Sequence, residues 1–176
     1  MKLVLDLETQ NSFQEIGGKS NLALLKISVV GAYWYGDGRY YTFGEGELDK
    51  LEEFLKKAEL VIGFNLVGFD YPVLQNYLKN FNFSGLRTLD IMVDAERYLG
   101  YKIKLEDVAQ GSLNIGKSGT GLDAIKFWKE NSIDKLKKYC LKDVEVTKNI
   151  YEYGVQNKEI KFKSLWEKYP IPVDWY

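Results

Sequence analysis

The chain has 176 residues, of which 45% are apolar and 28% are charged, and this length is typical of one globular domain at ~100 to 200 residues per domain. Its 24 lysines and arginines nearly balance 25 aspartates and glutamates, giving a formal net charge of -1, which excludes a protein held to nucleic acid by a basic excess alone. The absence of histidine and the single cysteine, Cys140, exclude Ser-His-Asp triads, Cys-His dyads, the usual zinc sites and an internal disulfide.

We expect residues 1–176 to form a single domain, with a core from about residue 2 to residue 153 and a C-terminal tail, residues 154–176, that packs on it. No segment reaches the ~18 consecutive apolar residues of a membrane span. The N-terminus lacks the charged region and cleavage site of a secretory signal. We therefore expect no membrane association and a cytoplasmic location.

The first part of the chain has the patterns of strands and a hairpin. Residues 2–7 (KLVLDL) form an apolar run typical of a buried central strand, and the polar residues 9–21 predict a loop. Two runs rich in β-branched and aromatic residues, 24–35 and 39–43, flank the turn Gly36-Asp37-Gly38. This arrangement predicts an antiparallel hairpin.

The middle of the chain has the patterns of strand and helix units. Apolar residues at helical spacing predict an amphipathic helix over residues 47–58, and the apolar run 60–64 predicts a further strand. Pro72 suits the first turn of a helix that we expect to reach about residue 79. The elements expected after it are a short extended segment at 86–89 and helices at 90–99, 104–110 and 133–153.

Two segments of the second half depart from regular patterns. Residues 111–121 are too rich in glycine for a regular element, and the tail, residues 158–176, is expected to lie across the domain. Strands first, βα units in the middle and helices afterwards are typical of an α/β fold. We expect a mixed central sheet of about five strands flanked by helices.

Two acidic residues lie at the end of the first predicted strand. Asp6 and Glu8 are two positions apart, so their side chains leave the same face of the strand. Like charges on one face repel each other unless a cation lies between them, and Mg²⁺ prefers carboxylate oxygens. The pair is consistent with a divalent metal site, and equally with a solvated strand end.

Asp70 ends the segment Asn65-Leu66-Val67-Gly68-Phe69-Asp70, which follows a later predicted strand. Open α/β sheets bind ligands at strand ends, so Asp70 is a candidate to face Asp6 and Glu8. Asp is also a preferred N-cap, and Asp70 precedes the helix expected at Pro72. Taken alone, the residue favours the capping role, although a metal contact through water would be compatible with partial capping.

Tyr139 and Asp143 are four positions apart on the long predicted helix and therefore share one face. A tyrosine hydroxyl beside a carboxylate can orient a water molecule. Taken alone, such a pair more often combines a core-facing ring with a solvated charge. The neighbouring Cys140 is expected to be a small buried filler.

Together, these three elements resemble a known enzyme family. The matching segments are Asp6-Leu7-Glu8-Thr9, Asn65-Leu66-Val67-Gly68-Phe69-Asp70 and Tyr139-Cys140-Leu141-Lys142-Asp143. Their order and separation resemble the tyrosine (DEDDy) branch of the DEDD superfamily of 3′–5′ exonucleases, which has a ribonuclease H-like fold and includes the exonuclease domain of family B DNA polymerases. The resemblance spans roughly residues 2–153, and the absence of histidine agrees with it, because the other branch has a histidine in place of Tyr139.

The resemblance implies a hydrolase that uses two Mg²⁺ or Mn²⁺ ions to remove nucleotides from the 3′ end of single-stranded DNA or RNA. It implies that Asp6, Glu8 and Asp143 hold one ion, that Asp6 bridges to the second, and that Asp70 supports the second directly or through water. Tyr139 would position the attacking water. Two cations ~3.5–4 Å apart can stabilise both the incoming hydroxide and the leaving 3′ oxygen.

The resemblance also implies contacts to the substrate. The residues just after the acidic pair, near Thr9, would hold the terminal nucleotide, and Asn65 would contact the substrate or brace the site. The loop at residues 9–21 departs from the shorter, more regular segment of many relatives. The resemblance therefore does not specify how this loop would hold the terminal nucleotide.

Residues 111–118 (GSLNIGKS) match the phosphate-loop pattern G-x-x-x-x-G-K-[ST]. That loop requires an apolar strand before it and a helix directly after it, whereas a predicted helix precedes residue 111 and Gly119-Thr120-Gly121 would interrupt the helix that must follow. A P-loop nucleotide-binding protein is therefore the less favoured alternative, and Lys117 is a candidate contact to substrate phosphates. A non-catalytic nucleic-acid-binding module of the same fold is the other alternative.

Two groups of lysines have the composition of a path for a single strand, which needs cations for phosphates and rings for bases. One group lies on the long helix, and the other alternates with aromatic residues in the tail. A solvated helix face and a tail whose rings pack on the core are the favoured interpretation. The lysines are Lys135, Lys137, Lys138 and Lys142 on the helix and Lys158, Lys161, Lys163 and Lys168 in the tail.

Overall fold

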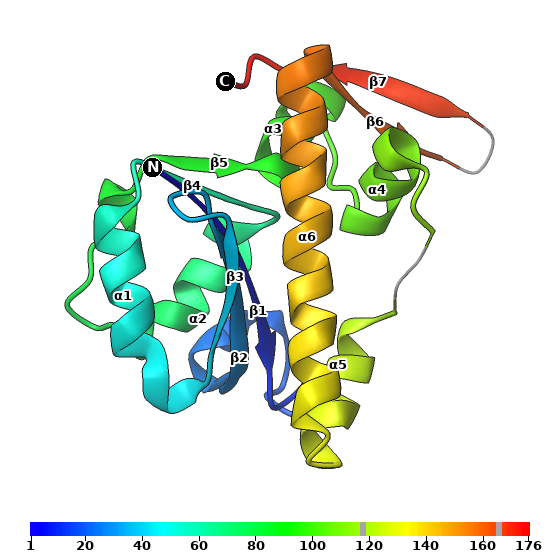
Figure 1. Ribbon diagram of the computed structural model, residues 1–176. Helices are drawn as coiled ribbons and strands as arrows, with labels where there is room; N and C mark the ends of the chain where they lie inside the picture. The colour runs from blue at the N-terminus through cyan, green and yellow to red at the C-terminus, as the bar shows by residue number, and fades with distance from the viewer. Residues whose placement is uncertain (117–118, 165–166) are drawn as a thin grey trace.

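The computed structural model describes residues 1–116, 119–164 and 167–176. At its centre is a five-stranded mixed sheet in the order β3-β2-β1-β4-β5 (Figure 1). β2 is antiparallel to β1 and β3, whereas β4 is parallel to β1 and β5. The expected α/β fold with about five strands is confirmed. The strands are β1 (Lys2–Thr9), β2 (Ile27–Trp34), β3 (Arg39–Phe43), β4 (Leu60–Gly63) and β5 (Thr88–Asp90).

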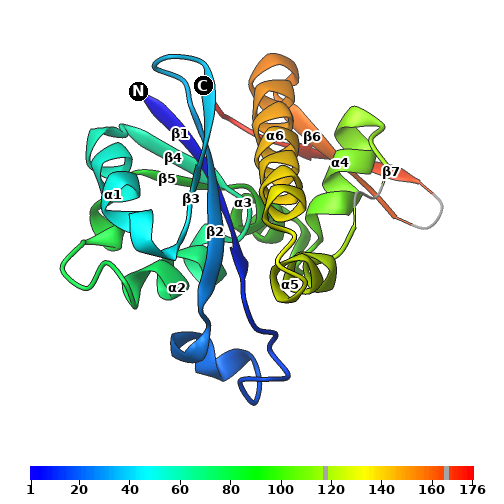
Figure 2. The same ribbon diagram turned by 60° about the horizontal axis from the view of Figure 1, so that its bottom comes forward.

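Helices cover both faces of this sheet. Figures 1 and 2 place α6 on one side of the strands and α1 and α2 on the other. Short helical turns occur at Lys19–Leu24, Glu45–Glu47, Leu66–Asp70 and Phe83–Gly85. The α-helices are α1 (Leu48–Lys57), α2 (Tyr71–Gln75), α3 (Ile91–Leu99), α4 (Leu105–Leu113), α5 (Gly121–Lys129) and α6 (Ile133–Asn157).

The alternation of side chains along β1 divides the core into two layers. Leu3, Leu5 and Leu7 pack in the layer that contains α1 and α2. Val4 packs in the opposite layer, which contains α6. Because successive side chains of a strand point to opposite faces, the face that carries Val4 continues with Asp6 and Glu8. The sequence of β1 therefore directs both carboxylates towards α6.

Residues 111–113 are helical, although their glycine-rich composition predicts an irregular segment. They form the end of α4. Gly111 lies against the backbone of Lys161, where an added Cβ would collide with the Lys161 carbonyl oxygen. Glycine is tolerated in this helix because α4 must approach the C-terminal strand closely.

Helix α5 is a second difference, since no helix is expected there from the sequence. Thr120 and Asp123 form a capping box at its start, and the Thr120 N–H donates to Asp123 Oδ2 at 2.8 Å. This pattern is the signal from which the helix was predictable. The helix expected at Pro72 ends early, at Gln75, whose side-chain amide donates to the carbonyl oxygens of Leu78 and Phe81 and stabilises a turn there.

The tail is more regular than the sequence suggests. It forms a two-stranded antiparallel sheet of β6 (Glu159–Lys163) and β7 (Lys168–Pro172), which packs on α4 and α6. Pro170 and Pro172 are compatible with β7 because that strand is an edge, where a missing N–H is tolerated. Among the described residues, the structure has no helix with the length and apolar character that crossing a membrane requires.

Candidate active site

Three of the predicted carboxylates meet at the surface between β1 and α6. Asp6 and Glu8 extend from β1, and Asp143 extends from the middle of α6. One carboxylate oxygen from each lies within 4.8 Å of the others. All three residues are partly buried. Carboxylate oxygens gathered in this way can hold a divalent metal ion.

Close packing of α6 on the sheet brings Asp143 to this position. Asp6 pairs with Gly31 of β2 in the strand register. Cys140, one turn before Asp143 on α6, is fully buried, and its Sγ lies 3.6 Å from the Asp6 carbonyl oxygen and 3.8 Å from Asp6 Oδ2. Cys140, expected only to fill space in the core, therefore also contacts Asp6.

Asp70 approaches the same edge of the sheet from the neighbouring strand. It ends the helical turn Leu66–Asp70, which follows β4, and β4 runs parallel to β1. The Asp70 side chain is only 2% exposed, and its Oδ1 has no hydrogen-bond partner among the described residues. Burial raises the pKa of this carboxyl well above its usual range, and the charge of Asp6 raises it further.

The capping role that the sequence favours for Asp70 alone is wrong. Its side chain makes no hydrogen bond to the start of α2. The turn Leu66–Asp70 runs directly into α2, and the Tyr71 N–H donates to the Leu66 carbonyl oxygen. At an isolated helix start this backbone N–H would need a cap, but here the preceding turn supplies its acceptor. The buried Asp70 side chain therefore does not serve as a helix cap.

Asp90 is not among the site residues expected from the sequence. It caps α3, and its carboxylate also accepts hydrogen bonds from the backbone N–H groups of Asn65, at 2.7 Å, and Val67, at 3.0 Å. It therefore holds the turn that carries Asp70. An Asp between a short extended run and an apolar helix is a recognisable N-cap, but its second contact, to a turn 25 residues earlier in the chain, has no local signature.

The site is strongly negative. Burial raises the pKa of Asp6, and the nearby Asp143 adds to the effect. Burial is also the main cause that raises the pKa of Glu8. The charges of Asp6, Asp143 and Asp70 raise it further. Repulsion among buried carboxylates is relieved by a bound cation or by protonation. The chemistry of the donors therefore fits a hard divalent ion.

Tyr139 lies one turn before Asp143 on α6, as the sequence predicts. Its ring packs at 6.5 Å from that of Phe127, and an added Cβ on Gly119 would be 2.9 Å from Tyr139 Cε2. Burial raises the pKa of the phenol, followed by the charges of Asp143 and Glu8. Tyr139 is therefore a neutral O–H donor at physiological pH. Together with Asp143 and Glu106, it lines a small cavity of about 110 Å³.

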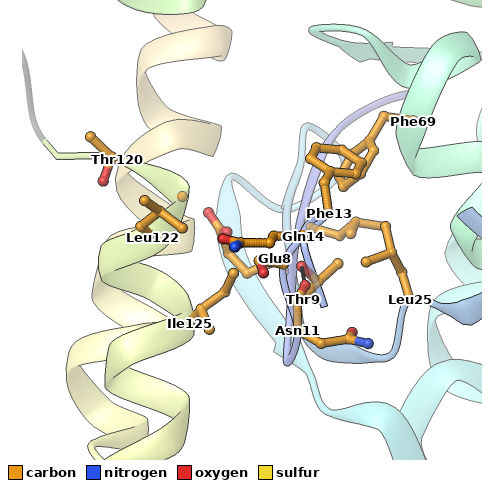
Figure 3. Close-up of a pocket in the computed structure, with 13 residues that line it drawn as sticks. Glu8, Thr9, Asn11, Phe13, Gln14, Leu25, Phe69, Thr120, Leu122 and Ile125 are labelled. Carbon is orange, nitrogen blue, oxygen red and sulfur yellow. Dashed lines mark hydrogen bonds between the residues drawn. The ribbon is translucent and has the colours of Figure 1, made fainter. Parts of the chain in front are cut away.

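A larger groove of about 400 Å³ begins at Glu8, and we call it the carboxylate groove (Figure 3). Thr9 lines it, and the Thr9 hydroxyl donates to the Asn11 carbonyl oxygen at 2.9 Å. Phe13 and Phe69 form an edge-to-face pair at 5.7 Å on one wall. Thr120 and residues of α5 form the opposite wall, as Figure 3 shows.

Asn65, another predicted substrate contact, lies in a different groove from Thr9. Asn65 has a left-handed backbone, with φ of 68°, and its side chain lies over Gly68. It lines a second groove, described below, rather than the carboxylate groove. Lys117 lies outside the residues that the structure describes.

The phosphate-loop alternative does not fit the fold. The motif begins inside α4, so a helix and not an apolar strand leads into it. Gly111, the first glycine of the motif, packs against the Lys161 backbone in β6. A P-loop needs a strand that ends at the loop, and the described residues of this segment do not provide one.

Comparison with known proteins agrees with this architecture. A family model described as RNase_H superfamily matches residues 5–155. The fold is similar to the structure of the family B DNA polymerase from the hyperthermophilic archaeon Pyrobaculum calidifontis, with a TM-score of 0.67 and 20% sequence identity. The match covers 88% of this chain and 24% of the polymerase chain. No curated protein matches the chain.

Proposed function

Because the chain belongs to the RNase H superfamily, we propose that it is a metal-dependent 3′–5′ exonuclease that hydrolyses phosphodiester bonds at the 3′ end of single-stranded DNA or RNA. The observation that carries this proposal is the convergence of Asp6, Glu8 and Asp143 within 4.8 Å beside a groove lined by Phe13 and Phe69. An RNase H-like fold supports a nuclease, and the direction of cleavage is part of the proposal.

The proposed cofactors are two Mg²⁺ or Mn²⁺ ions. Asp6, Glu8 and Asp143 would hold one, and Asp6 would be shared with the second. Asp70 would support the second directly or through water, a role that suits a buried carboxylate with an unsatisfied Oδ1. When bound, such ions neutralise charge that develops on the attacking and leaving oxygens at phosphorus.

Tyr139 is proposed to orient the attacking water. Its phenol stays protonated, because burial and the neighbouring carboxylates raise its pKa. A protonated phenol can donate a hydrogen bond to the oxygen of the attacking water or hydroxide and hold that oxygen in position at phosphorus. Asp143, four residues later on α6, belongs to the same carboxylate cluster and would hold a metal ion beside that water.

The terminal nucleotide is proposed to lie in the carboxylate groove. Thr9, Asn65 and Lys117 are the proposed substrate contacts. The rings of Phe13 and Phe69, 5.7 Å apart, offer apolar faces to a base, and stacking on aromatic rings is a common way to hold single strands without reading their sequence. We also propose that residues 1–176 work as one domain, with residues 154–176 packed on the core.

The test is the degradation of a 5′-labelled single-stranded oligonucleotide in the presence of Mg²⁺ or Mn²⁺. We expect a ladder that shortens from the 3′ end, and loss of cleavage with a chelator, with Asp6→Ala or with Asp143→Asn. Asp134→Asn is the matched control, since Asp134 lies exposed in the first turn of the same helix. Cleavage of a circular single strand, or activity that survives the chelator, contradicts the proposal. Oligonucleotide binding without metal-dependent turnover would favour a non-catalytic binding module instead.

A further inference from the structure

Three grooves on the described surface are connected by shared residues. The carboxylate groove shares Phe13 and Phe69 with a groove of about 590 Å³, which we call the middle groove. The middle groove shares residues 102–104 with a third groove of about 610 Å³, the hairpin groove, which lies beside β6. The three grooves therefore adjoin one another, in a series from Glu8 to the sheet formed by β6 and β7.

Residues 102–104 form the crossing between the last two grooves. Ile103 is buried in the core layer of α6, whereas Lys102 and Lys104 are exposed. The backbone at Lys104 is extended, with φ of -97° and ψ of 153°, so alternate side chains point to opposite sides. The buried isoleucine thus anchors a segment that presents two lysines to solvent. Neither lysine forms an ion pair with a carboxylate of residues 1–116, 119–164 or 167–176.

The middle and hairpin grooves are positive although the chain as a whole is not. Lys19, Lys102 and Lys104 line the middle groove, and its described lining includes no acidic residue. Lys102, Lys104 and Lys163 line the hairpin groove, where Asp107 is the one acidic residue among the described lining. In a chain with a formal net charge of -1, this concentration of cations is a local feature that suits a chain of phosphates.

Aromatic rings accompany these cations in the hairpin groove. Tyr101 is 54% exposed, and its ring packs edge-on at 6.4 Å against the buried Phe162. Phe162 stacks on Tyr169 at 5.3 Å. The buried ring holds Tyr101 in place while its other surface stays open to solvent. Cations beside an exposed, supported ring are the features that single-strand channels combine.

The other tail lysines have structural partners. Lys161 pairs with Glu159 at 3.0 Å, Lys168 bonds Asn114 at 2.5 Å, and Lys158 bonds the Trp175 carbonyl oxygen at 2.8 Å. Of the four tail lysines considered from the sequence, Lys163 is therefore the one that lines the hairpin groove. The favoured interpretation of the tail holds for most of these residues but not for Lys163.

We infer that the nucleic-acid strand upstream of the 3′ end runs from the carboxylate groove through the middle groove, over Lys102 and Lys104, into the hairpin groove, where Tyr101 stacks on a base. The assignment of the 3′ end to the carboxylates rests on the proposed exonuclease function. The binding path itself does not, because it depends on the charges and rings of the grooves. It predicts that the protein binds long single strands more tightly than short ones.

The experiment measures binding of a labelled oligonucleotide of about 16 nucleotides and one of about 4 nucleotides by fluorescence anisotropy in the presence of a chelator. We expect the Lys102→Glu/Lys104→Glu double variant to bind the long strand at least tenfold more weakly. The dependence of its log affinity on log salt should also be shallower by about 1.4, since each lost contact to a single strand removes about 0.7. Tyr101→Ala should weaken binding roughly tenfold with little change in that slope.

Two controls separate the path from general effects of charge and folding. Lys56→Glu/Lys57→Glu makes the same charge change on α1, on the opposite side of the sheet. Tyr98→Ala removes a ring of α3 that is 59% exposed, close to the exposure of Tyr101, and lines none of the three grooves. Both controls should bind like the unmodified protein.

The outcomes test the binding path and the exonuclease function separately. Long-strand binding that is unchanged in the Lys102/Lys104 variant, that falls equally in the α1 control, or that is undetectable in the unmodified protein at low salt overturns the path. Lysine-dependent binding without metal-dependent cleavage keeps the path and rejects the exonuclease. If cleavage does occur, the Lys102/Lys104 variant should slow hydrolysis of the long strand more than hydrolysis of a dinucleotide.

Discussion

Gly31 of β2 and Cys140 of α6 are in contact at a point where no side chain fits on the glycine. An added Cβ on Gly31 would be 2.8 Å from Cys140 Sγ and 3.0 Å from Val144 Cγ2. Gly31 also pairs with Asp6 across the strands. The distance between α6 and the sheet, and with it the distance between Asp143 and Asp6, thus depends on the absence of a side chain at one position of β2.

We therefore expect Gly31→Ala to lower nuclease activity at least tenfold and to reduce the free energy of unfolding by about 1–3 kcal/mol, because overpacking forces a backbone or helix shift. Adding Cys140→Ala should restore part of both losses, since it removes the nearer contact. Gly46→Ala is the control, because an added Cβ there meets nothing within 4 Å. Urea unfolding and initial cleavage rates measure the two effects, and strictly additive changes in the double variant would argue against a direct clash.

Asp90 provides a second prediction, on the turn that carries Asp70. Asp90→Ala removes the acceptor for the N–H groups of Asn65, Val67, Met92 and Val93. We expect a loss of about 2–4 kcal/mol in the free energy of unfolding, because buried donors are left without partners and a helix cap is lost.

Activity should fall with Asp90→Ala even at temperatures where the variant is fully folded, since the turn no longer holds Asp70. Asp90→Asn keeps an acceptor oxygen and should be affected less. Asp49→Ala, which changes an exposed acidic residue in the first turn of α1, should leave both properties unchanged. Full activity in folded Asp90→Ala would show that the turn does not depend on this residue.

The parts of the fold that the sequence predicts are those with a local pattern. The apolar run of β1, the turn Gly36-Asp37-Gly38 and the helical spacing of α6 all correspond to observed elements. The alternation of β1 also places Asp6 and Glu8 on one face. These features depend on a period of two or 3.6 residues, which a single sequence displays directly.

The features that the sequence does not predict depend on contacts between distant segments. Gly111 is helical because β6 lies against it. Asp70 is not a cap because the preceding turn satisfies the start of α2. Asp90 holds a turn 25 residues away. In each case the tertiary environment overrides the local preference of the residue. Such contacts leave no periodic pattern in the sequence from which they could be predicted.

The repulsion among the carboxylates gives a third prediction, on stability and pH. A carboxyl whose pKa is higher in the folded chain than in the unfolded chain binds more protons when folded, so the free energy of unfolding falls as pH rises from the unfolded pKa through the folded pKa. The pKa values of Asp6, Glu8 and Asp70 are all raised by burial and then by neighbouring carboxylates, from ordinary values of 3.8 for Asp and 4.5 for Glu. The metal-free site therefore destabilises the fold increasingly above about pH 4.

Asp70→Asn removes one of these charges. In a chelator, we expect the variant to be more stable than the unmodified protein at about pH 7.5, because burial and the charge of Asp6 make the ionised Asp70 carboxylate unfavourable in the folded chain. The difference should shrink as pH falls and disappear below about pH 3, where the carboxyls are protonated in both states. Added Mg²⁺ should stabilise the unmodified protein more than the variant. Urea unfolding at several pH values tests this, and a difference that does not change with pH contradicts it.

The last prediction concerns Tyr139. Tyr139→Phe keeps the ring against Phe127 and Gly119 and removes only the hydroxyl, so folding and metal affinity should be unchanged while kcat falls by about 10² or more, the range typical of lost proton or water positioning. Burial and the charge of Asp143 raise the pKa of the phenol, so Tyr139 stays protonated across the accessible alkaline range. The alkaline side of the pH–rate profile should therefore have the same shape in Tyr139→Phe as in the unmodified protein. An alkaline limb that disappears in the variant would instead mean that Tyr139 loses its proton during turnover and acts as a base.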